Sequence, residues 1–212
     1  MDSFTKKTIK TSRGLTYTYW VRPSNEKKPA LLLQHGFPDD HELWTNIVPY
    51  LITLGFPIIV PDLLGYGETA KPSDPKEYNL KDLSQDLMDV VDNEGHRHII
   101  SVGHDWGAMM AQRLLLFHPE RVVGLILLNV AYRPPAEANA EQANAMLVKL
   151  TGLPRIAYQQ FFIGDNAREL MEGNLESSFH ALHGTDEGTT NFMEDLLCHH
   201  VSQQRRVNRQ TW

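Results

Sequence analysis

The sequence predicts an α/β fold, in which a mostly parallel sheet is covered by helices on both faces. Uninterrupted apolar runs at residues 30–34, 58–60 and 122–128 have the length and composition of buried strands. Segments with apolar residues at helical spacing lie between these runs. Because strands that alternate with helices build parallel crossover units, this order favours a layered α/β domain.

The individual elements follow from local composition. Residues 16–21 are β-branched and aromatic, which is typical of a strand. Residues 80–91 carry leucines and valines at helical spacing, and Gly55 ends a similar segment that begins at Trp44. The complete expectation is strands at 16–21, 30–34, 58–60, 98–102 and 122–128, and helices at 44–52, 80–91 and 108–117.

The character of the chain changes where Pro134 and Pro135 interrupt the alternation of strands and helices. Beyond this point the spacing predicts no further strand, and it predicts helices at 136–149, 155–162 and 167–175. Such a helical segment is expected over the carboxyl ends of the strands, where α/β proteins place their sites. We therefore expect an incomplete core at 1–132, a helical cap segment at 133–198 and a disordered tail at 199–212.

Composition and charge restrict the class of function. The 212 residues are 42% apolar and 22% charged, which is typical of a globular protein. A net charge of −6 gives no electrostatic reason to expect nucleic acid or an anionic membrane as a partner. No apolar stretch is long enough to span a membrane, and the single cysteine excludes an internal disulfide, so a cytoplasmic location is expected. No residue pattern indicates a bound metal or cofactor.

The pentapeptide Gly-His-Asp-Trp-Gly at residues 103–107 is the most informative motif. It lies between an expected strand and an expected helix, which is the layout of a nucleophile elbow. The nucleophile position holds Asp105 instead of serine. A carboxylate that attacks an sp³ carbon forms an alkyl ester that water can later cleave, whereas attack on a carbonyl would give a mixed anhydride with little advantage. Asp105 therefore indicates an electrophile such as an epoxide or an alkyl halide.

Hydrolysis of such an ester requires an oxyanion hole, which an elbow of this kind forms from backbone N–H groups. One donor follows the nucleophile, and the other lies in the loop after an early strand. Trp106 and Phe37 occupy these two places. Residues expected to support the two loops are His35, Gly36, Pro38, Gly103, His104 and Gly107.

Several motifs occur together in one order along the chain. They are His-Gly-Phe-Pro at 35–38, Trp44, the loop at 62–69 and the elbow at 103–107. With this set the chain resembles the epoxide hydrolase branch of the α/β-hydrolase superfamily. The resemblance implies an α/β-hydrolase fold, opening of a small apolar epoxide by Asp105, and hydrolysis of the ester to a diol. A role in specialised metabolism is the accompanying expectation.

The resemblance also implies that tyrosines of the cap donate protons to the epoxide oxygen. Tyr158 and the residues after it are similar to the first tyrosine segment of the cap. A second cap tyrosine would lie beyond Trp212. From the residues alone, Tyr158 is equally well a packing residue of the cap.

Haloalkane and haloacid dehalogenases are the alternative within the superfamily. They also use an aspartate elbow, and the tryptophan after the nucleophile can bind the departing halide. Many of them place asparagine after His-Gly, whereas this chain has Phe37 there, which favours the epoxide. Fluoroacetate dehalogenases also carry His-Gly-Phe-Pro, so this alternative stays open.

Hydrolysis of the ester further requires a histidine that a carboxylate orients. In the family these residues follow strands beyond the cap, and no such strand is expected here. Asn129, where some dehalogenases place the acid, cannot hold a charge, and His199 and His200 are the remaining mobile histidines. We therefore interpret the chain as a C-terminally truncated enzyme that stops at the ester, or as a catalytically dead remnant that at most binds ligand. Without the last two strands, strand 122–128 is an open edge, which favours self-association.

Overall fold

The computed structural model describes residues 3–135, 140–152, 156, 158–176 and 178–179. The chain divides into two units, Met1–Pro134 and Pro135–Trp212. Each unit is described here by itself. The tail expected at 199–212, and with it His199 and His200, lies outside the described residues.

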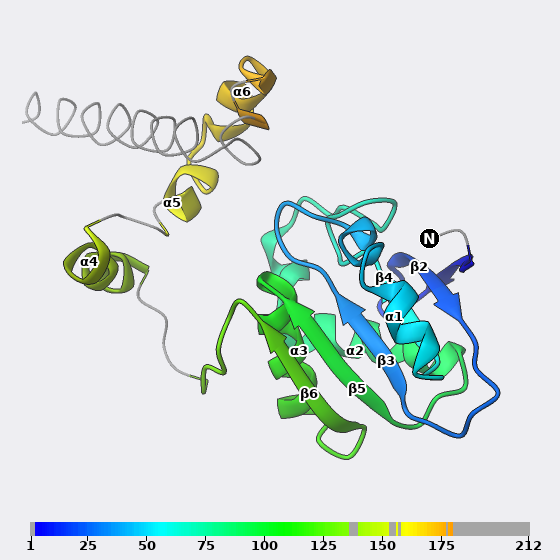
Figure 1. The fold of residues 1–212 in the computed structure, drawn as a ribbon. Helices are drawn as coiled ribbons and strands as arrows, with labels where there is room; N and C mark the ends of the chain where they lie inside the picture. The colour runs from blue at the N-terminus through cyan, green and yellow to red at the C-terminus, as the bar shows by residue number, and fades with distance from the viewer. Residues whose placement is uncertain (1–2, 136–139, 153–155, 157, 177, 180–212) are drawn as a thin grey trace, which may run out of the picture. The chain divides into compact units, whose positions relative to one another are not determined.

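A six-stranded sheet forms the centre of the first unit, in the order β1-β2-β4-β3-β5-β6 (Figure 1). The strands β3, β4, β5 and β6 run parallel, whereas β1 and β2 are antiparallel to their neighbours. The prediction of a mostly parallel sheet is therefore confirmed. The strands are β1 Thr5–Lys10, β2 Thr16–Arg22, β3 Ala30–Gln34, β4 Ile58–Pro61, β5 Ile99–His104 and β6 Val122–Leu128.

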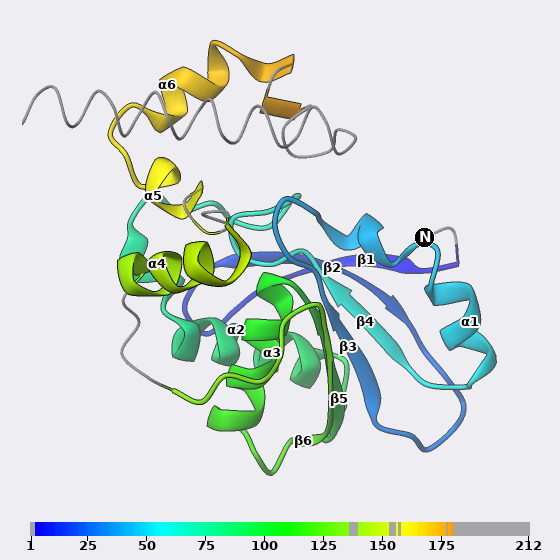
Figure 2. The same ribbon diagram turned by 60° about the vertical axis from the view of Figure 1, so that its left-hand side comes forward.

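Helices cover both faces of this sheet, as Figures 1 and 2 show. Helix α1 (Val48–Thr53) packs on one face, and α2 (Leu80–Asn93) and α3 (Trp106–Phe117) pack on the other. Alternate residues of a strand point to opposite faces, so every central strand contributes to two apolar cores. In β3, Leu31 and Leu33 join the core beside α1, whereas Ala30 and Leu32 join the core beside α2 and α3.

The structure corrects the expected elements in two places. Strand β1 was not expected, because three of its six residues are lysines and it contains a single large apolar residue, Ile9. The helix expected at 44–52 is instead a short 3₁₀ helix, His41–Trp44, followed by α1. Pro49 lies in the first turn of α1, where the missing N–H of proline costs nothing.

The second unit contains three helices among the residues that the structure describes. They are α4 Ala140–Thr151, α5 Tyr158–Phe162 and α6 Ala167–Glu172. Each lies within or beside a segment that the spacing predicted to be helical, although parts of the segments at 136–149 and 155–162 fall outside the described residues. None of the described helices is long and apolar enough to cross a membrane.

Candidate active site

A sharp turn at Asp105 joins β5 to α3. The backbone of Asp105 has φ 54° and ψ −120°, and the helix begins at the next residue, Trp106. A non-glycine residue rarely adopts a positive φ, and such residues concentrate at functional sites because the surrounding structure must hold them there. The turn places the Asp105 carboxylate, which is partly exposed, at the N-terminus of α3. The strand, turn and helix expected at 98–117 are therefore present.

Glycines allow the elbow to lie against its neighbours. A Cβ atom at Gly107 would stand 2.1 Å from the carbonyl oxygen of Gln34, and one at Gly103 would stand 2.2 Å from the carbonyl oxygen of Gly107. A Cβ atom at Gly36 would stand 2.5 Å from Cβ of Asp105 and 2.6 Å from its Oδ1 atom. Because any side chain at these positions would collide, the three glycines let the loop after β3 approach the nucleophile directly.

The loop after β3 bonds to the predicted nucleophile. The backbone N–H of Phe37 donates a hydrogen bond to Oδ1 of Asp105, at 3.1 Å. Trp106 is the first residue of α3, and the N–H groups of a first helical turn have no partner within the helix. The two N–H groups expected to form an oxyanion hole therefore come from the two segments that meet at this carboxylate. Oxygen Oδ1, which accepts from Phe37, is the atom that would carry the negative charge when water attacks an Asp105 ester, and this leaves Oδ2 to attack the substrate.

His35 holds the loop from below. Its Nε2 atom accepts from the N–H of Leu63 at 2.9 Å, so the ring proton lies on Nδ1, which is 2.9 Å from the carbonyl oxygen of Gly36. The ring is fully buried and meets Tyr66 edge-on. Burial lowers the pKa of His35, so the ring is neutral. His35 therefore ties the loops after β3 and β4 together, which gives a physical basis for the supporting role expected of it.

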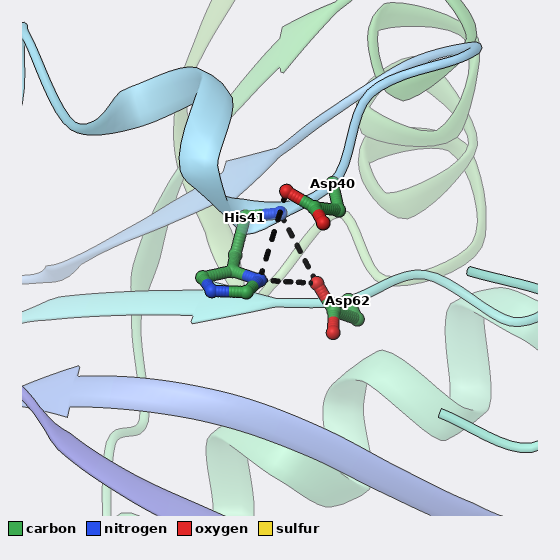
Figure 3. A group of neighbouring side chains, drawn as sticks. All are labelled: Asp40, His41 and Asp62. Carbon is green, nitrogen blue, oxygen red and sulfur yellow. Dashed lines mark hydrogen bonds and ion pairs between the residues drawn. The ribbon is translucent and has the colours of Figure 1, made fainter. Parts of the chain in front are cut away.

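A second histidine contact in this region was not foreseen from the sequence. Asp62 follows β4 and is fully buried, and its Oδ1 atom accepts from both the backbone N–H and the Nδ1 atom of His41, at 3.1 and 2.8 Å (Figure 3). Its Oδ2 atom accepts from the N–H of Glu68. The His41 ring also stacks on Trp20, with 3.4 Å between the ring centroids. These bonds connect residues 21 positions apart, so no local sequence pattern could have revealed them.

Asp40 lies beside this pair, and its oxygen, Nδ1 of His41 and an oxygen of Asp62 fall within 4.8 Å of one another. Three such atoms could in principle surround a metal ion. However, Oδ1 of Asp40 accepts from the N–H of Glu42, and Oδ1 of Asp62 accepts from the N–H of His41. The carboxylates thus serve to brace the backbone between β3 and the 3₁₀ helix.

The other predicted site residues lie in different surroundings. Pro38 is exposed and follows Phe37 through a cis peptide bond. His104 ends β5, and its Nδ1 atom is buried without a hydrogen-bond partner among the described residues. Asn129 is exposed and has φ 71° directly after β6. Tyr158 begins α5 in the second unit and meets Phe162 edge-on, and its role in catalysis stays a prediction.

The described part of the first unit also contains a cavity of about 240 Å³, far from the elbow in the topology. Its lining includes Ile58 at the start of β4, so it opens at the amino ends of the parallel strands, whereas Asp105 follows the carboxyl end of β5. The Lys7 ammonium in its wall is already paired with Glu94 at 2.8 Å. Since α/β proteins bind substrates at the carboxyl ends of their strands, the elbow is the candidate active site.

Comparison with known proteins assigns the fold and site to a family. Residues 29–197 match the family described as alpha/beta hydrolase fold, and the chain belongs to this family. Its relatives in sequence and in structure include epoxide hydrolases from fungi, plants, mammals and bacteria, so the resemblance to this branch is confirmed.

Two sequence relatives illustrate the similarity. The chain is 32% identical over 196 residues to epoxide hydrolase srdG of Neurospora crassa, an alignment that covers 85% of this chain and 56% of that protein. It is 40% identical over 106 residues to epoxide hydrolase 3 of Siraitia grosvenorii, which covers 50% of this chain and 34% of that protein. The chain thus spans about half the length, or less, of these relatives.

Solved structures show the same relationship. A variant of the epoxide hydrolase of Vigna radiata superposes with a TM-score of 0.71 at 26% identity, over 87% of this chain and 56% of the other. Epoxide hydrolase A of Mycobacterium thermoresistibile superposes with a TM-score of 0.62 at 28% identity, over 68% of this chain and 45% of the other.

Proposed function

We propose that this chain carries the nucleophilic half of an epoxide hydrolase. In this proposal Oδ2 of Asp105 attacks a carbon of a small apolar epoxide, the carbon–oxygen bond of the ring breaks, and the released oxygen takes up a proton. The product is an alkyl ester on Asp105. The observation that carries the proposal is the bond from the Phe37 N–H to Oδ1 of an aspartate held at positive φ in a strand–turn–helix elbow.

The position of the carboxylate supports its role as a nucleophile. The N-terminus of α3 provides a partial positive charge, and the Phe37 N–H orients one oxygen of Asp105. A carboxylate that is fixed before the substrate arrives loses little entropy on reaction. Names of the relatives agree with this chemistry, because the fungal, plant and bacterial proteins reported above are called epoxide hydrolases.

The choice of an epoxide over an alkyl halide rests on Phe37. A departing halide requires donors from side chains near the nucleophile, and the phenyl ring of Phe37 offers none. An epoxide oxygen instead needs a proton, for which Tyr158 is the proposed donor. The dehalogenase alternative therefore predicts reaction with a bromoalkane, and the present proposal predicts a preference for the epoxide.

The second half-reaction requires a general base. Among the described residues, His41 is the histidine that pairs with carboxylates, and its Nδ1 atom is occupied by Asp62 while its Nε2 atom lies 3.4 Å from Glu42. That pair therefore braces a loop and does not serve Asp105 as a base. We accordingly propose that the ester accumulates on this chain, which distinguishes it both from an enzyme that turns over and from a remnant that only binds ligand.

The test is incubation of the purified chain with styrene oxide, followed by measurement of the intact mass. The expected result is one addition per chain, which disappears in Asp105→Asn and persists in Asp82→Asn, an exposed carboxylate of α2. Hydrolysis of the isolated adduct by base in ¹⁸O-water should then place ¹⁸O in the Asp105 carboxylate and none in the diol. No addition under any condition, or an addition that survives Asp105→Asn, would refute the proposal.

A further inference from the structure

The two edges of the central sheet differ in their protection against pairing with another strand. An edge strand exposes unpaired N–H and C=O groups, and soluble proteins commonly protect such edges with lysines or prolines. Strand β1, at one edge, carries Lys6, Lys7 and Lys10 among its six residues. Strand β6, at the other edge, has the sequence VVGLILL and contains neither a charged residue nor proline.

The backbone geometry identifies which groups of β6 are free. The C=O of Leu128 accepts from the N–H of Asp105, so Leu128 points its backbone groups toward β5. In a strand these groups alternate in direction, so Ile126 also bonds toward β5, whereas Leu125 and Leu127 point theirs away from the sheet. Within the described residues of the first unit, β6 is the last strand of the sheet and no strand pairs with this outer side.

The side chains of β6 are also unusually exposed for a parallel strand. Val123, Ile126 and Leu128 are 58%, 47% and 37% exposed. Helix α3 lies on one face of β6 and adds Leu116 and Phe117, which are also exposed. An apolar strip of this kind, next to a row of free backbone groups, is typical of a surface that another strand covers.

We propose that the outer edge of β6 is an interface between two copies of this chain, whose β6 strands pair antiparallel about a twofold axis. Charge favours a second copy as the occupant. A lysine-rich strand such as β1 would place like charges opposite one another when it pairs with itself, which is destabilising. Strand β6 has no charge to repel its own copy, and its alternating Leu125 and Leu127 groups present a donor and an acceptor to the same groups of the partner.

The inference makes a directional prediction for substitutions at the edge. In an antiparallel pair about the twofold axis, Ile126 lies opposite residue 124, 126 or 128 of the other copy, so the two Ile126 side chains are direct or diagonal neighbours. Ile126→Lys should therefore place two like charges close together and weaken dimerisation by roughly tenfold or more. Ile47→Lys is the matched control, because Ile47 has the same side chain, is 42% exposed and lies next to α1.

The experiment is sedimentation velocity over a range of protein concentrations, with hydrogen exchange of the Leu125 and Leu127 amides as a second measurement. The proposal predicts a monomer–dimer equilibrium, weakened by Ile126→Lys and unchanged by Ile47→Lys, with protection of both amides that increases with concentration. A mixture of Ile126→Lys with Ile126→Glu should restore the dimer, which also shows that the variants are folded. A wild type that stays monomeric at its highest soluble concentration, equal effects of the two lysines, or failure of the mixture to dimerise would overturn it. In that case a different polypeptide would have to cover the edge.

Discussion

Gly36→Ala is the substitution whose effect on the site can be worked out most fully from the structure. The added Cβ atom would stand 2.5 Å from Cβ of Asp105, whereas ordinary contact begins at about 3.4 Å. It would also stand 2.8 Å from the backbone oxygen of His104, so the loop cannot relieve the collision by moving toward β5. The loop and Asp105 must therefore separate by about 0.9 Å.

A displacement of this size has two measurable consequences. Misplacement of a reacting group by about 1 Å lowers rates by about 100-fold, so alkylation of Asp105 by styrene oxide should slow by that factor. Overpacking should also lower the free energy of unfolding by about 1–3 kcal/mol. The control is Gly124→Ala, because a Cβ atom there meets only the side chain of Ile100, at 3.3 Å, and that side chain can move. Alkylation rates of Gly36→Ala and wild type within twofold of each other would refute the reasoning.

Two further predictions concern stability. Asp86 is fully buried and bonds to Arg13 and Tyr17, so Asp86→Ala should lower the free energy of unfolding in urea by about 3–5 kcal/mol. The exposed Asp82→Ala should change it by less than about 0.5 kcal/mol, and equal effects would contradict this account. Burial lowers the pKa of His35, so only the unfolded chain takes up its proton just below pH 6.5, and this contribution to stability should fall as the pH drops through that region. The fall should be smaller in His35→Gln, and parallel curves for the two proteins would exclude His35 as its source.

Much of the first unit could be predicted because its elements have strong local signals. The buried strands β3, β4 and β6 are continuous apolar runs, and α2 carries apolar residues at helical spacing. Strand β1 has no such signal, because an edge strand with three lysines resembles a polar loop in composition. Its place in the sheet depends on pairing with β2, which is a tertiary interaction.

The predicted site shows the same division. Asp105 and Phe37 could be identified because each lies in a short motif after an apolar strand, and the structure brings them into contact across 68 positions. The bond between His41 and Asp62 could not be identified in this way, because neither residue is in a recognisable motif. Only the parallel arrangement of β3 and β4, which places the ends of both strands together, shows that the two residues meet.

The central claim is that Asp105 attacks an sp³ carbon, and its most direct test is the location of the adduct within the chain. Cleavage after Arg97 and Arg113 releases a peptide, residues 98–113, in which Asp105 is the only carboxylate side chain. After incubation with styrene oxide, the account predicts that this peptide alone gains the mass of the epoxide, at Asp105, as a linkage that base cleaves. An adduct on His98 or His104, or on another peptide with this one unchanged, would contradict the account.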